Sequence, residues 1–205
     1  MNKETENTNG GNEILGGTYW SNRYDTADTG WDLGQVSPPI KAYIDHLGNK
    51  NLRILIPGCG NTYEAEYLLQ QGFTDVTVID IAPVLVASLK EKFKGNAHIK
   101  IILGDFFEHK GEYDLILEQT FFCAIDPSLR PTYVSKMNEL LAEKGKIAGV
   151  LFDTVFDKPG PPFGGSKEAY RPMFEKHFTL KTFEPCYNSF DKRRGTELFV
   201  ILCKR

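Results

Sequence analysis

Residues 52–62 read LRILIPGCGNT, and residues 76–80 read VTVID. A short apolar run that is closed by Pro-Gly-x-Gly is typical of a buried parallel strand entering a tight turn. Glycines in such a turn let the backbone approach a bound ligand closely, which makes Gly58 and Gly60 candidate binding residues. The second run ends in Asp80, about twenty residues further on, where a carboxylate can accept both hydroxyls of a ribose. The two runs together predict a site for a nucleoside cofactor.

Strand-like and helix-like patterns alternate along most of the chain. This alternation predicts an α/β fold with a doubly wound, seven-stranded, mostly parallel sheet that has helices on both faces. The last two strands follow one another without a helix, so we expect a final antiparallel strand. The predicted strands span residues 52–57, 75–80, 98–103, 113–118, 146–152, 178–184 and 196–203. The predicted helices span residues 38–47, 62–71, 83–93, 128–141 and 166–176.

Length and composition indicate one globular domain that handles small molecules. The chain has 205 residues, 41% of them hydrophobic, and a formal net charge of −3, so neither nucleic acid nor a membrane surface is an expected partner. The longest apolar run, residues 147–152, is too short to span a bilayer, and residues 1–12 lack the apolar core of a signal peptide. We therefore expect a cytoplasmic protein. The four cysteines are scattered without a metal-binding spacing, which predicts reduced thiols and no metal site.

The N-terminal region divides into two parts. Residues 1–17 are rich in Asn, Glu, Thr and Gly and are predicted to be disordered, whereas residues 18–205 form the domain. Within the domain, residues 18–48 contain Trp20 and Tyr24 four residues apart on one face of a short helix, followed by Trp31 in a loop. From composition alone, these aromatics are more often a plug packed on the sheet than a cover over a ligand.

The glycine turn favours a cofactor without phosphates. Thr62 stands where the dinucleotide fingerprint has its third glycine, and S-adenosylmethionine has no pyrophosphate that would require it. After the third predicted strand, the Asp105 carboxylate is placed to accept from an adenine amino group and the Phe106 N–H to donate to a ring nitrogen. Two alternatives stay open: Asp80 is a helix N-cap, and Asp105 is an ordinary turn residue.

The sequence resembles the thiopurine S-methyltransferase superfamily, a group of class I S-adenosylmethionine-dependent methyltransferases with a Rossmann-like fold. It is most similar to the bacterial members and the plant halide/thiol methyltransferases, and the resemblance covers residues 19–203. The motifs that carry it are Trp20 and Tyr24 ahead of WDLGQ (31–35), IPGCG (56–60), EQTFFCAIDP (118–127), GPPF (160–163) and RGTELF (194–199).

The resemblance implies roles for the early aromatics and for the strand ends. It reverses the compositional expectation, since in the family these aromatics close over the cofactor. Trp20 is then near the methionine carboxylate, Trp31 with Tyr24 roofs the pocket, and residues 18–48 form an N-terminal cover. It also leans towards a monomer. The predicted cofactor-binding residues are Trp20, Tyr24, Trp31, Gly58, Cys59, Gly60, Asp80, Ile81, Asp105, Phe106 and Glu118.

The acceptor is predicted to be a small soft nucleophile: a thiol, hydrosulfide, thiocyanate or halide, or a heterocyclic thiol of the thiopurine kind. Such nucleophiles need no general base, and no catalytic base is evident. Strand four also lacks the Asn/Asp-Pro-Pro-aromatic motif of amine methyltransferases. The chain departs from the family twice, with Gln119 where animal thiopurine enzymes carry Arg and Phe163 where the halide/thiol enzymes carry Tyr. The candidate substrate-pocket residues are Glu118, Gln119, Phe121, Phe122, Phe163 and Arg194.

Several alternatives stay open at this stage. Glu118 either faces the methyl region of the cofactor or caps the following turn. Arg193 and Arg194 either attract an anion or form a solvated basic turn. For the whole protein, the alternatives are a non-catalytic adenosyl-ligand-binding protein and, less favoured, a nicotinamide-dependent reductase. Thr62 and the lack of a Tyr-x-x-x-Lys pair argue against the reductase.

Overall fold

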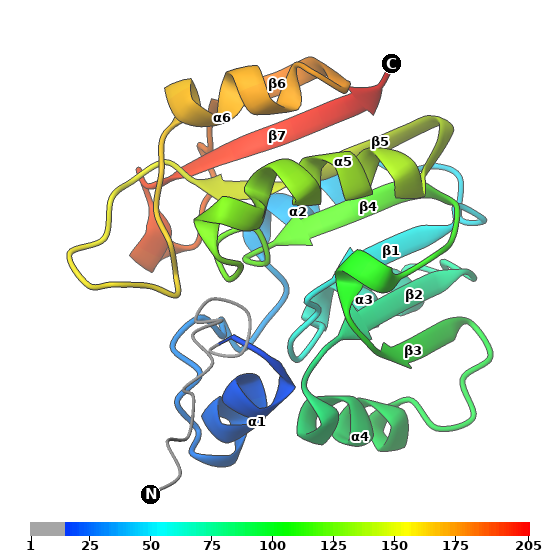
Figure 1. Cartoon of the computed structure of the whole chain (residues 1–205). Helices are drawn as coiled ribbons and strands as arrows, with labels where there is room; N and C mark the ends of the chain where they lie inside the picture. The colour runs from blue at the N-terminus through cyan, green and yellow to red at the C-terminus, as the bar shows by residue number, and fades with distance from the viewer. Residues whose placement is uncertain (1–14) are drawn as a thin grey trace, which may run out of the picture.

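The computed structural model describes residues 15–205 and contains a seven-stranded sheet with strand order β3-β2-β1-β4-β5-β7-β6 (Figure 1). The first five strands are parallel to one another, and β7 is antiparallel to both β5 and β6. The strands are β1 (Ile54–Pro57), β2 (Val76–Asp80), β3 (Ile99–Leu103), β4 (Tyr113–Gln119), β5 (Leu141–Phe152), β6 (Phe178–Pro185) and β7 (Glu197–Lys204). The predicted fold class and the final antiparallel strand are confirmed. The position of β7 inside the sheet is an addition to the prediction.

Helices cover both faces of the sheet. Alternate residues along the strands enter two separate cores, since Leu55 and Ile116 pack on the side of α5 and α6, whereas Ile54 and Ile56 pack on the side of α2, α3 and α4. In Figure 1, α5 crosses in front of β4 and β5, and α1 lies beside α4. The helices are α1 (Gly17–Asp25), α2 (Pro38–Asp45), α3 (Tyr63–Gln70), α4 (Pro83–Lys92), α5 (Arg130–Leu140) and α6 (Lys167–Phe174).

The predicted and observed elements differ most at the junction of α5 and β5. The sequence predicts a gap between residues 141 and 146, but β5 begins at Leu141, immediately after α5. Leu141 is buried and pairs with Tyr113 of β4, so apolar burial extends the strand five residues before its predicted start at residue 146. Short 3-10 turns, η1 (Phe106–Glu108), η2 (Pro127–Leu129) and η3 (Asp191–Arg193), complete the structure.

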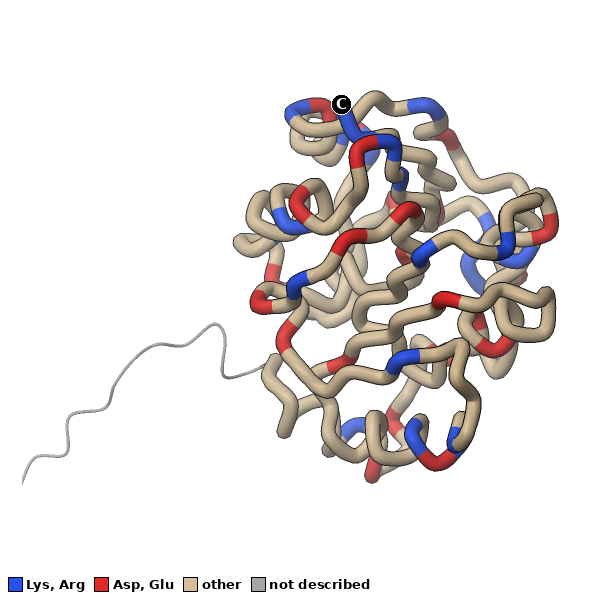
Figure 2. The backbone as a smooth tube through the Cα atoms, turned by 90° about the vertical axis from the view of Figure 1, so that its right-hand side faces the viewer, with Lys and Arg blue, Asp and Glu red and all other residues tan. Residues whose placement is uncertain are grey.

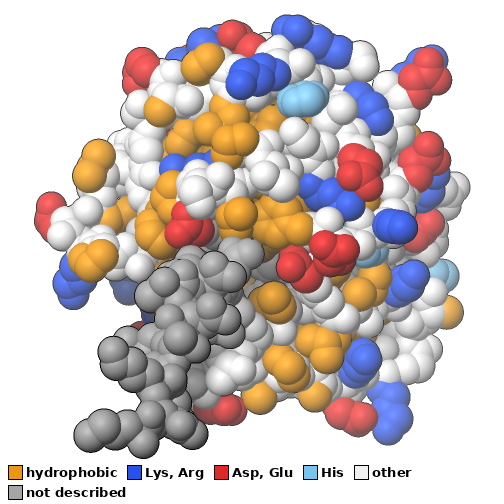
Figure 3. Space-filling model, viewed as in Figure 1, with side chains coloured by type: hydrophobic (Ala, Val, Ile, Leu, Met, Phe, Trp, Pro, Cys, Tyr) orange, Lys and Arg blue, Asp and Glu red, His pale blue; other side chains and the backbone are white. Residues whose placement is uncertain are grey.

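The surface carries mixed charges. Figure 2 shows basic and acidic residues interspersed along the described chain. On the face in Figure 3, hydrophobic side chains gather over the middle of the molecule, and charged side chains are most frequent around its outline. Within residues 15–205, no helix is long and apolar enough to cross a membrane. The predicted disorder of residues 1–17 falls mainly on residues 1–14, which lie outside the described part of the chain, and Gly17 begins α1.

Candidate active site

The turn after β1 brings backbone to the edge of a cavity. Gly58 and Gly60 have φ values of +54° and +52°, the left-handed conformation that glycine adopts without steric cost. A Cβ at Gly58 would lie 2.2 Å from the ring of Phe121, and a Cβ at Gly60 would lie 3.5 Å from the hydroxyl of Tyr24. The two glycines therefore allow an aromatic side chain to approach each side of the turn.

Asp80 is fixed at the end of β2 beside this turn. Its Oδ2 accepts from the Gly60 N–H at 3.2 Å, and its Oδ1 accepts from the Ala82 N–H at 3.0 Å. Burial raises the pKa of this carboxyl, although the two backbone donors oppose the shift. The bond to Ala82 is a local turn contact and not a helix N-cap, because Ala82 itself occupies the N-cap position of α4. The N-cap alternative is therefore wrong, and the Asp80 side chain lines the cavity.

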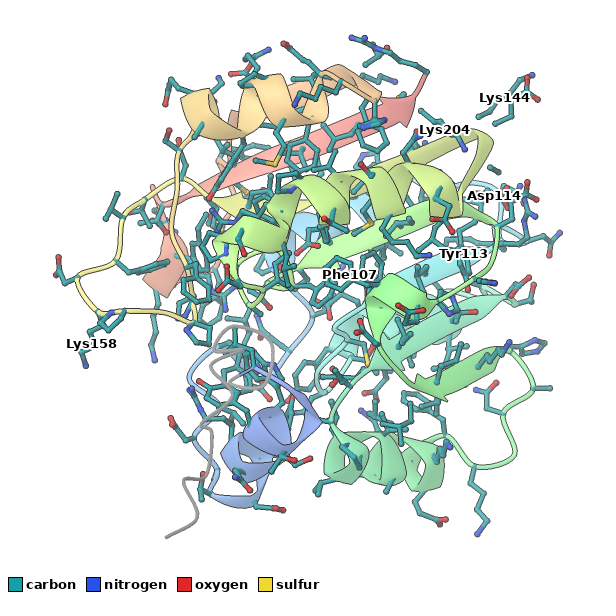
Figure 4. All side chains as sticks on the ribbon, in the orientation of Figure 1. Phe107, Tyr113, Asp114, Lys144, Lys158 and Lys204 are labelled. Atoms are coloured by element: carbon teal, nitrogen blue, oxygen red, sulfur yellow. The ribbon has the colours of Figure 1, made fainter. Side chains whose placement is uncertain are left out.

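Asp105 lies at the equivalent position after β3. Its Oδ1 accepts from the Phe107 N–H at 2.8 Å and caps η1, as an ordinary turn residue would. Asp105 and Phe106 both line the cavity, and Phe106 is otherwise buried. Phe107, which the sequence analysis did not consider, also lines the cavity, and Figure 4 places it near the centre of the molecule.

The early aromatics form a cluster above the glycine turn. Trp31 meets Trp20 and Tyr24 edge to face, at centroid distances of 5.4 and 5.7 Å. The guanidinium of Arg23 lies 4.9 Å from the Trp31 ring, and the Trp31 carbonyl accepts from Arg193 Nη2 at 2.6 Å. The segment that carries this cluster is therefore attached to the C-terminal part of the chain.

Asp32 attaches the same segment to the glycine turn. Its Oδ2 accepts from the side-chain amide of Asn61 and from the Tyr63 hydroxyl, the latter at 3.3 Å. Of the predicted cover, residues 18–48, only the part up to Gln35 lines the cavity. Ile40 and Ile44 in α2 are fully buried in the core that α2 shares with α3 and α4. Helix α2 therefore belongs to the layer of helices on that face of the sheet and not to the cover.

These elements enclose a cavity of about 430 Å³ at the carboxyl ends of β1 to β4. That volume is in the range of small-molecule sites, roughly 300–1,000 Å³. The cavity brings together most of the predicted site residues from six separate parts of the chain. Those that line it are Trp20, Tyr24, Trp31, Gly58, Cys59, Gly60, Asp80, Ile81, Asp105, Phe106, Gln119 and Phe121.

Glu118 lies behind the cavity wall and does not line it. It is 1% exposed, and its Oε1 accepts from the Phe121 and Phe122 N–H groups at 2.8 and 2.9 Å. The Tyr133 hydroxyl donates to its other oxygen. Burial raises the pKa of Glu118 to about 7, partly offset by these hydrogen bonds. Glu118 caps the turn, which was the alternative to a direct cofactor contact.

Two of the predicted pocket aromatics also point elsewhere. Thr120 has a φ of +61°, and the chain reverses there so that Phe121 faces the cavity while Phe122 enters the core. Phe122 is 2% exposed and packs 5.1 Å from the rings of both Tyr133 and Tyr170. Phe163 packs against Gly160 and is not among the cavity residues. The two prolines before it, Pro161 and Pro162, line the cavity in its place.

The two arginines before β7 have opposite environments. The Arg194 side chain is 71% exposed and pairs with Asp191 at 2.6 Å, which corrects its prediction as a pocket residue and fits the solvated turn. Arg193 is 8% exposed and pairs with Glu197 at 3.4 Å while donating to Trp31. The alternation of buried and exposed residues in a strand cannot predict which of the two arginines is buried, because both lie before β7 begins.

Arg130 is a buried residue beside the loop of Pro161 and Pro162 that the sequence analysis did not single out. It is the first residue of α5, where the positive end of the helix dipole disfavours a cation. Its guanidinium donates to the carbonyls of Phe163 and Gly164, both at 3.0 Å. An arginine at an electrostatically poor helix position is a signal that a sequence analysis can use.

Comparison with solved structures identifies the class. The crystal structure of 1,6-didemethyltoxoflavin-N1-methyltransferase from Burkholderia thailandensis, with 1,6-didemethyltoxoflavin and S-adenosylhomocysteine bound, is similar with a TM-score of 0.72 and 22% identity. The match covers 94% of this chain and 88% of that chain. The fold is therefore that of the Rossmann-like class I methyltransferases.

The chain belongs to the thiopurine S-methyltransferase family, whose sequence model matches residues 16–199. It is 30% identical to "Probable thiol methyltransferase 2" of Arabidopsis thaliana, over 82% of this chain and 73% of that protein. It is 26% identical to the thiopurine S-methyltransferase of Acinetobacter baylyi, over 91% and 98% of the two chains. The protein is an S-adenosylmethionine-dependent methyltransferase that acts on a small molecule, which confirms the predicted cofactor and replaces the reductase and the non-catalytic alternatives.

Proposed function

We infer that this enzyme transfers a methyl group to a small soft nucleophile: a thiol, hydrosulfide, thiocyanate or halide, or a heterocyclic thiol of the thiopurine kind. The observation that carries this inference is the composition of the cavity wall beyond Gly58. Phe121, Ile125, Pro161 and Pro162 make much of that wall apolar, Gln119, Asp126 and Thr132 also line it, and the described lining residues include no His or Lys. A soft nucleophile needs removal of its water and correct alignment more than it needs a base. The names of the thiol and thiopurine relatives agree with this acceptor class.

The residues at the strand ends fit the cofactor. Gly58 and Gly60 line the cavity without a side chain of their own, and Asp80 and Asp105 add carboxylates to the same lining. When bound, S-adenosylmethionine supplies a methyl group on a sulfonium sulfur, which leaves with the bonding electron pair as a nucleophile takes the carbon. In our proposal Asp80 accepts from the ribose hydroxyls, and Asp105 and the Phe106 N–H hold the adenine. Ile81 and Cys59 pack beside them.

The aromatic cluster excludes water from this site in our proposal. Trp20 lies over the amino acid end of the cofactor, and Trp31 with Tyr24 closes the roof. Aromatic faces also favour a positively charged sulfonium over water-filled space. Residues 18–35 therefore act as the cover, and the bonds of Trp31 to Arg193 and of Asp32 to Asn61 hold it in place.

Two cysteines on the cavity wall stay protonated. Burial raises the pKa of the Cys59 thiol, and the nearby Asp80 carboxylate adds to the shift. Burial also raises the pKa of the Cys123 thiol to about 12, and its Sγ donates to the Thr120 carbonyl at 3.2 Å. A thiol is a poor nucleophile until it loses its proton. The enzyme thus protects its own sulfurs from the methyl donor that its substrate attacks.

Partners and location are part of the same proposal. The net charge of −3 and the interspersed charges of Figure 2 favour a small-molecule substrate over nucleic acid or a membrane. We expect a cytoplasmic monomer. Sedimentation at micromolar concentration tests the monomer, and a stable dimer would contradict it.

The acceptor class is tested with radiolabelled S-adenosylmethionine and a panel of nucleophiles. Iodide, hydrosulfide, thiocyanate, thiophenol and a thiopurine are offered separately, together with a primary amine as the contrasting acceptor. We expect labelled product from one or more of the soft nucleophiles and none from the amine. Turnover of the amine alone would contradict the proposal.

A further inference from the structure

Arg130 is a cation enclosed by the protein. It is 6% exposed, and its Cζ lies 4.7 Å from the ring of Phe122 and 5.4 Å from the ring of Tyr170. Two of its nitrogens donate to the Phe163 and Gly164 carbonyls, while its Nε has no hydrogen-bond partner within residues 15–205. These contacts hold the guanidinium in one orientation.

Arg130 has no acid in direct contact. It forms no ion pair with any carboxylate in the described part of the chain, whereas the other well-buried arginine, Arg193, is paired with Glu197. The acid four residues earlier, Asp126, lines the cavity and caps η2; hydrogen bonds from the Ser128 hydroxyl and N–H and, to a smaller extent, the charge of Arg130 lower the pKa of its carboxyl. A buried charge without a counter-charge acts over a longer distance than a paired one, because the protein interior screens it weakly.

Arg130 stands directly behind the acceptor wall. Leu129, the preceding residue, lines the cavity, and Phe163, whose carbonyl Arg130 holds, follows the lining residues Pro161 and Pro162. The Phe163 N–H also donates to the Cys123 carbonyl at 2.7 Å. In Figure 4, Lys158 marks the far end of this loop, away from the body of the molecule. One side chain thus connects α5 to the cavity wall.

The positive field of Arg130 reaches the wall. Burial and then the Glu118 carboxylate raise the pKa of the Cys123 thiol, whereas Arg193 and Arg130 lower it to a smaller extent. Cys123 lines the cavity, so an acceptor beside it experiences these two guanidinium groups as well as the Glu118 carboxylate. The side chain that faces the cavity at the end of β4, Gln119, carries no charge of its own.

We propose that Arg130 determines the specificity of the enzyme for anionic acceptors, thiolates and halides, by its field through the wall of Cys123, Pro161 and Pro162. This inference rests on the proposed function. A cation behind the wall attracts an anion without donating a hydrogen bond to it. Because the anion loses its charge as the new bond forms, this attraction raises the affinity for the anion and does not accelerate the chemical step itself. The effect of Arg130 is therefore expected in KM.

The test compares an anionic ligand with a neutral ligand of the same shape. Thiophenolate is the anion, and methyl phenyl sulfide, the product of its methylation, is the neutral ligand. For Arg130→Met we expect KM for thiophenolate, hydrosulfide and iodide to rise about tenfold or more, while the inhibition constant of methyl phenyl sulfide stays within about twofold. Arg130→Lys keeps the charge without the paired carbonyl bonds and should retain most of the preference. Lys136→Met, a buried lysine of the same helix that pairs with Glu139, is the matched control and should leave both constants unchanged.

Each other outcome contradicts the inference. If binding of the anionic and the neutral ligand weakened equally in Arg130→Met, Arg130 would only hold the loop in position. If binding of neither ligand weakened, Arg130 would have no role in acceptor binding. If Arg130→Met does not fold, as checked by thermal unfolding, loss of the anion preference in Arg130→Lys would still overturn the inference. If the wild-type enzyme methylates none of the three anions, the proposed function is wrong. If the wild-type enzyme methylates them and Arg130→Met does so equally well, only the role of Arg130 is wrong.

Discussion

The two ends of the cavity are built by different means. At the cofactor end, the ligand-facing groups are backbone and short carboxylates at strand ends, held by bonds such as Gly60 N–H to Asp80. At the acceptor end, many lining residues are apolar, and two buried polar groups that position the wall, Glu118 and Arg130, lie behind it. In our proposal, the cofactor end recognises its ligand by contact, whereas at the acceptor end Arg130 acts on specificity from behind the wall.

The largest effect is expected at Gly58, where the two ends meet. Gly58→Ala places a Cβ 2.2 Å from the Phe121 ring and forces a left-handed conformation that costs a non-glycine residue roughly 1–2 kcal/mol. We expect loss of S-adenosylhomocysteine affinity and of methyl transfer by about a hundredfold or more, because both ends shift together. Gly72→Ala is the control, since its φ is +84° but nothing lies within 4 Å of the added carbon. Gly72→Ala should lower the free energy of unfolding and leave S-adenosylhomocysteine binding intact. If the two variants lost binding equally, the left-handed backbone conformation alone, and not the clash with Phe121, would explain the effect of Gly58→Ala.

The next effect concerns the buried acid of the acceptor end. The pKa of Glu118 is raised from 4.5 to about 7 in the folded protein, so its contribution to stability is complete below pH 4.5 and is lost as the pH rises to 7. The loss amounts to roughly 3 kcal/mol if the shift is fully expressed. We expect the unfolding free energy of Glu118→Gln, measured with urea from pH 4.5 to 8, to fall less steeply than that of the wild type below pH 7. Parallel curves would contradict the raised pKa, and Glu112→Gln, at an exposed site, is the control.

Asp80 tests recognition by contact at the cofactor end. Asp80→Asn replaces one acceptor oxygen by a donor that faces the Gly60 or Ala82 N–H, and it removes the charge. We expect S-adenosylhomocysteine to bind about 10- to 100-fold more weakly by calorimetry, as for the loss of a charge-assisted hydrogen bond. KM for the acceptor should change by less than about twofold, because the acceptor wall is independent of Asp80. An equal rise in both constants would contradict the separation of the two ends. Asp75→Asn, on the exposed loop before β2, is the control.

The smallest effect is expected for the bond between the cover and the C-terminal region. Arg193→Met combined with Glu197→Gln removes the bond to Trp31 without leaving a buried charge unpaired. We expect about tenfold weaker cofactor binding and a changed fluorescence, since both tryptophans of the chain lie in the cover. Arg194→Met should have no measurable effect. If Arg194→Met matched the double variant, the exposed arginine would have a role that its position does not explain.

More of the residues predicted for the cofactor than of those predicted for the acceptor line the cavity. Glycines and strand-end carboxylates are set by backbone geometry, so Gly58, Asp80 and Asp105 were found from their spacing and line the cavity. Phe121 and Phe122 are adjacent and chemically alike, and only the positive φ of Thr120 decides which one faces the cavity. No local pattern predicts that reversal.

Long-range packing accounts for the other differences. Arg130 and Phe163 are 33 residues apart, and their contact depends on how the loop after β5 returns to the start of α5. Similarly, the alternation of apolar residues predicts that the last two strands pair, but not that the later one enters the sheet between β5 and β6. Sequence periodicity describes elements, while these contacts depend on their arrangement.

The placement of β7 has a consequence for synthesis of the chain. Within residues 15–205, β6 has β7 as its single neighbour, and β7 follows it along the chain. While the nascent chain emerges, β6 is therefore without a strand partner until residues 197–204 have left the ribosome. Unpaired strands in such an interval are prone to associate with other chains. The strands β1 to β4, whose ends surround the cavity, can pair with one another before β7 has been synthesised, whereas β6 joins the sheet only afterwards.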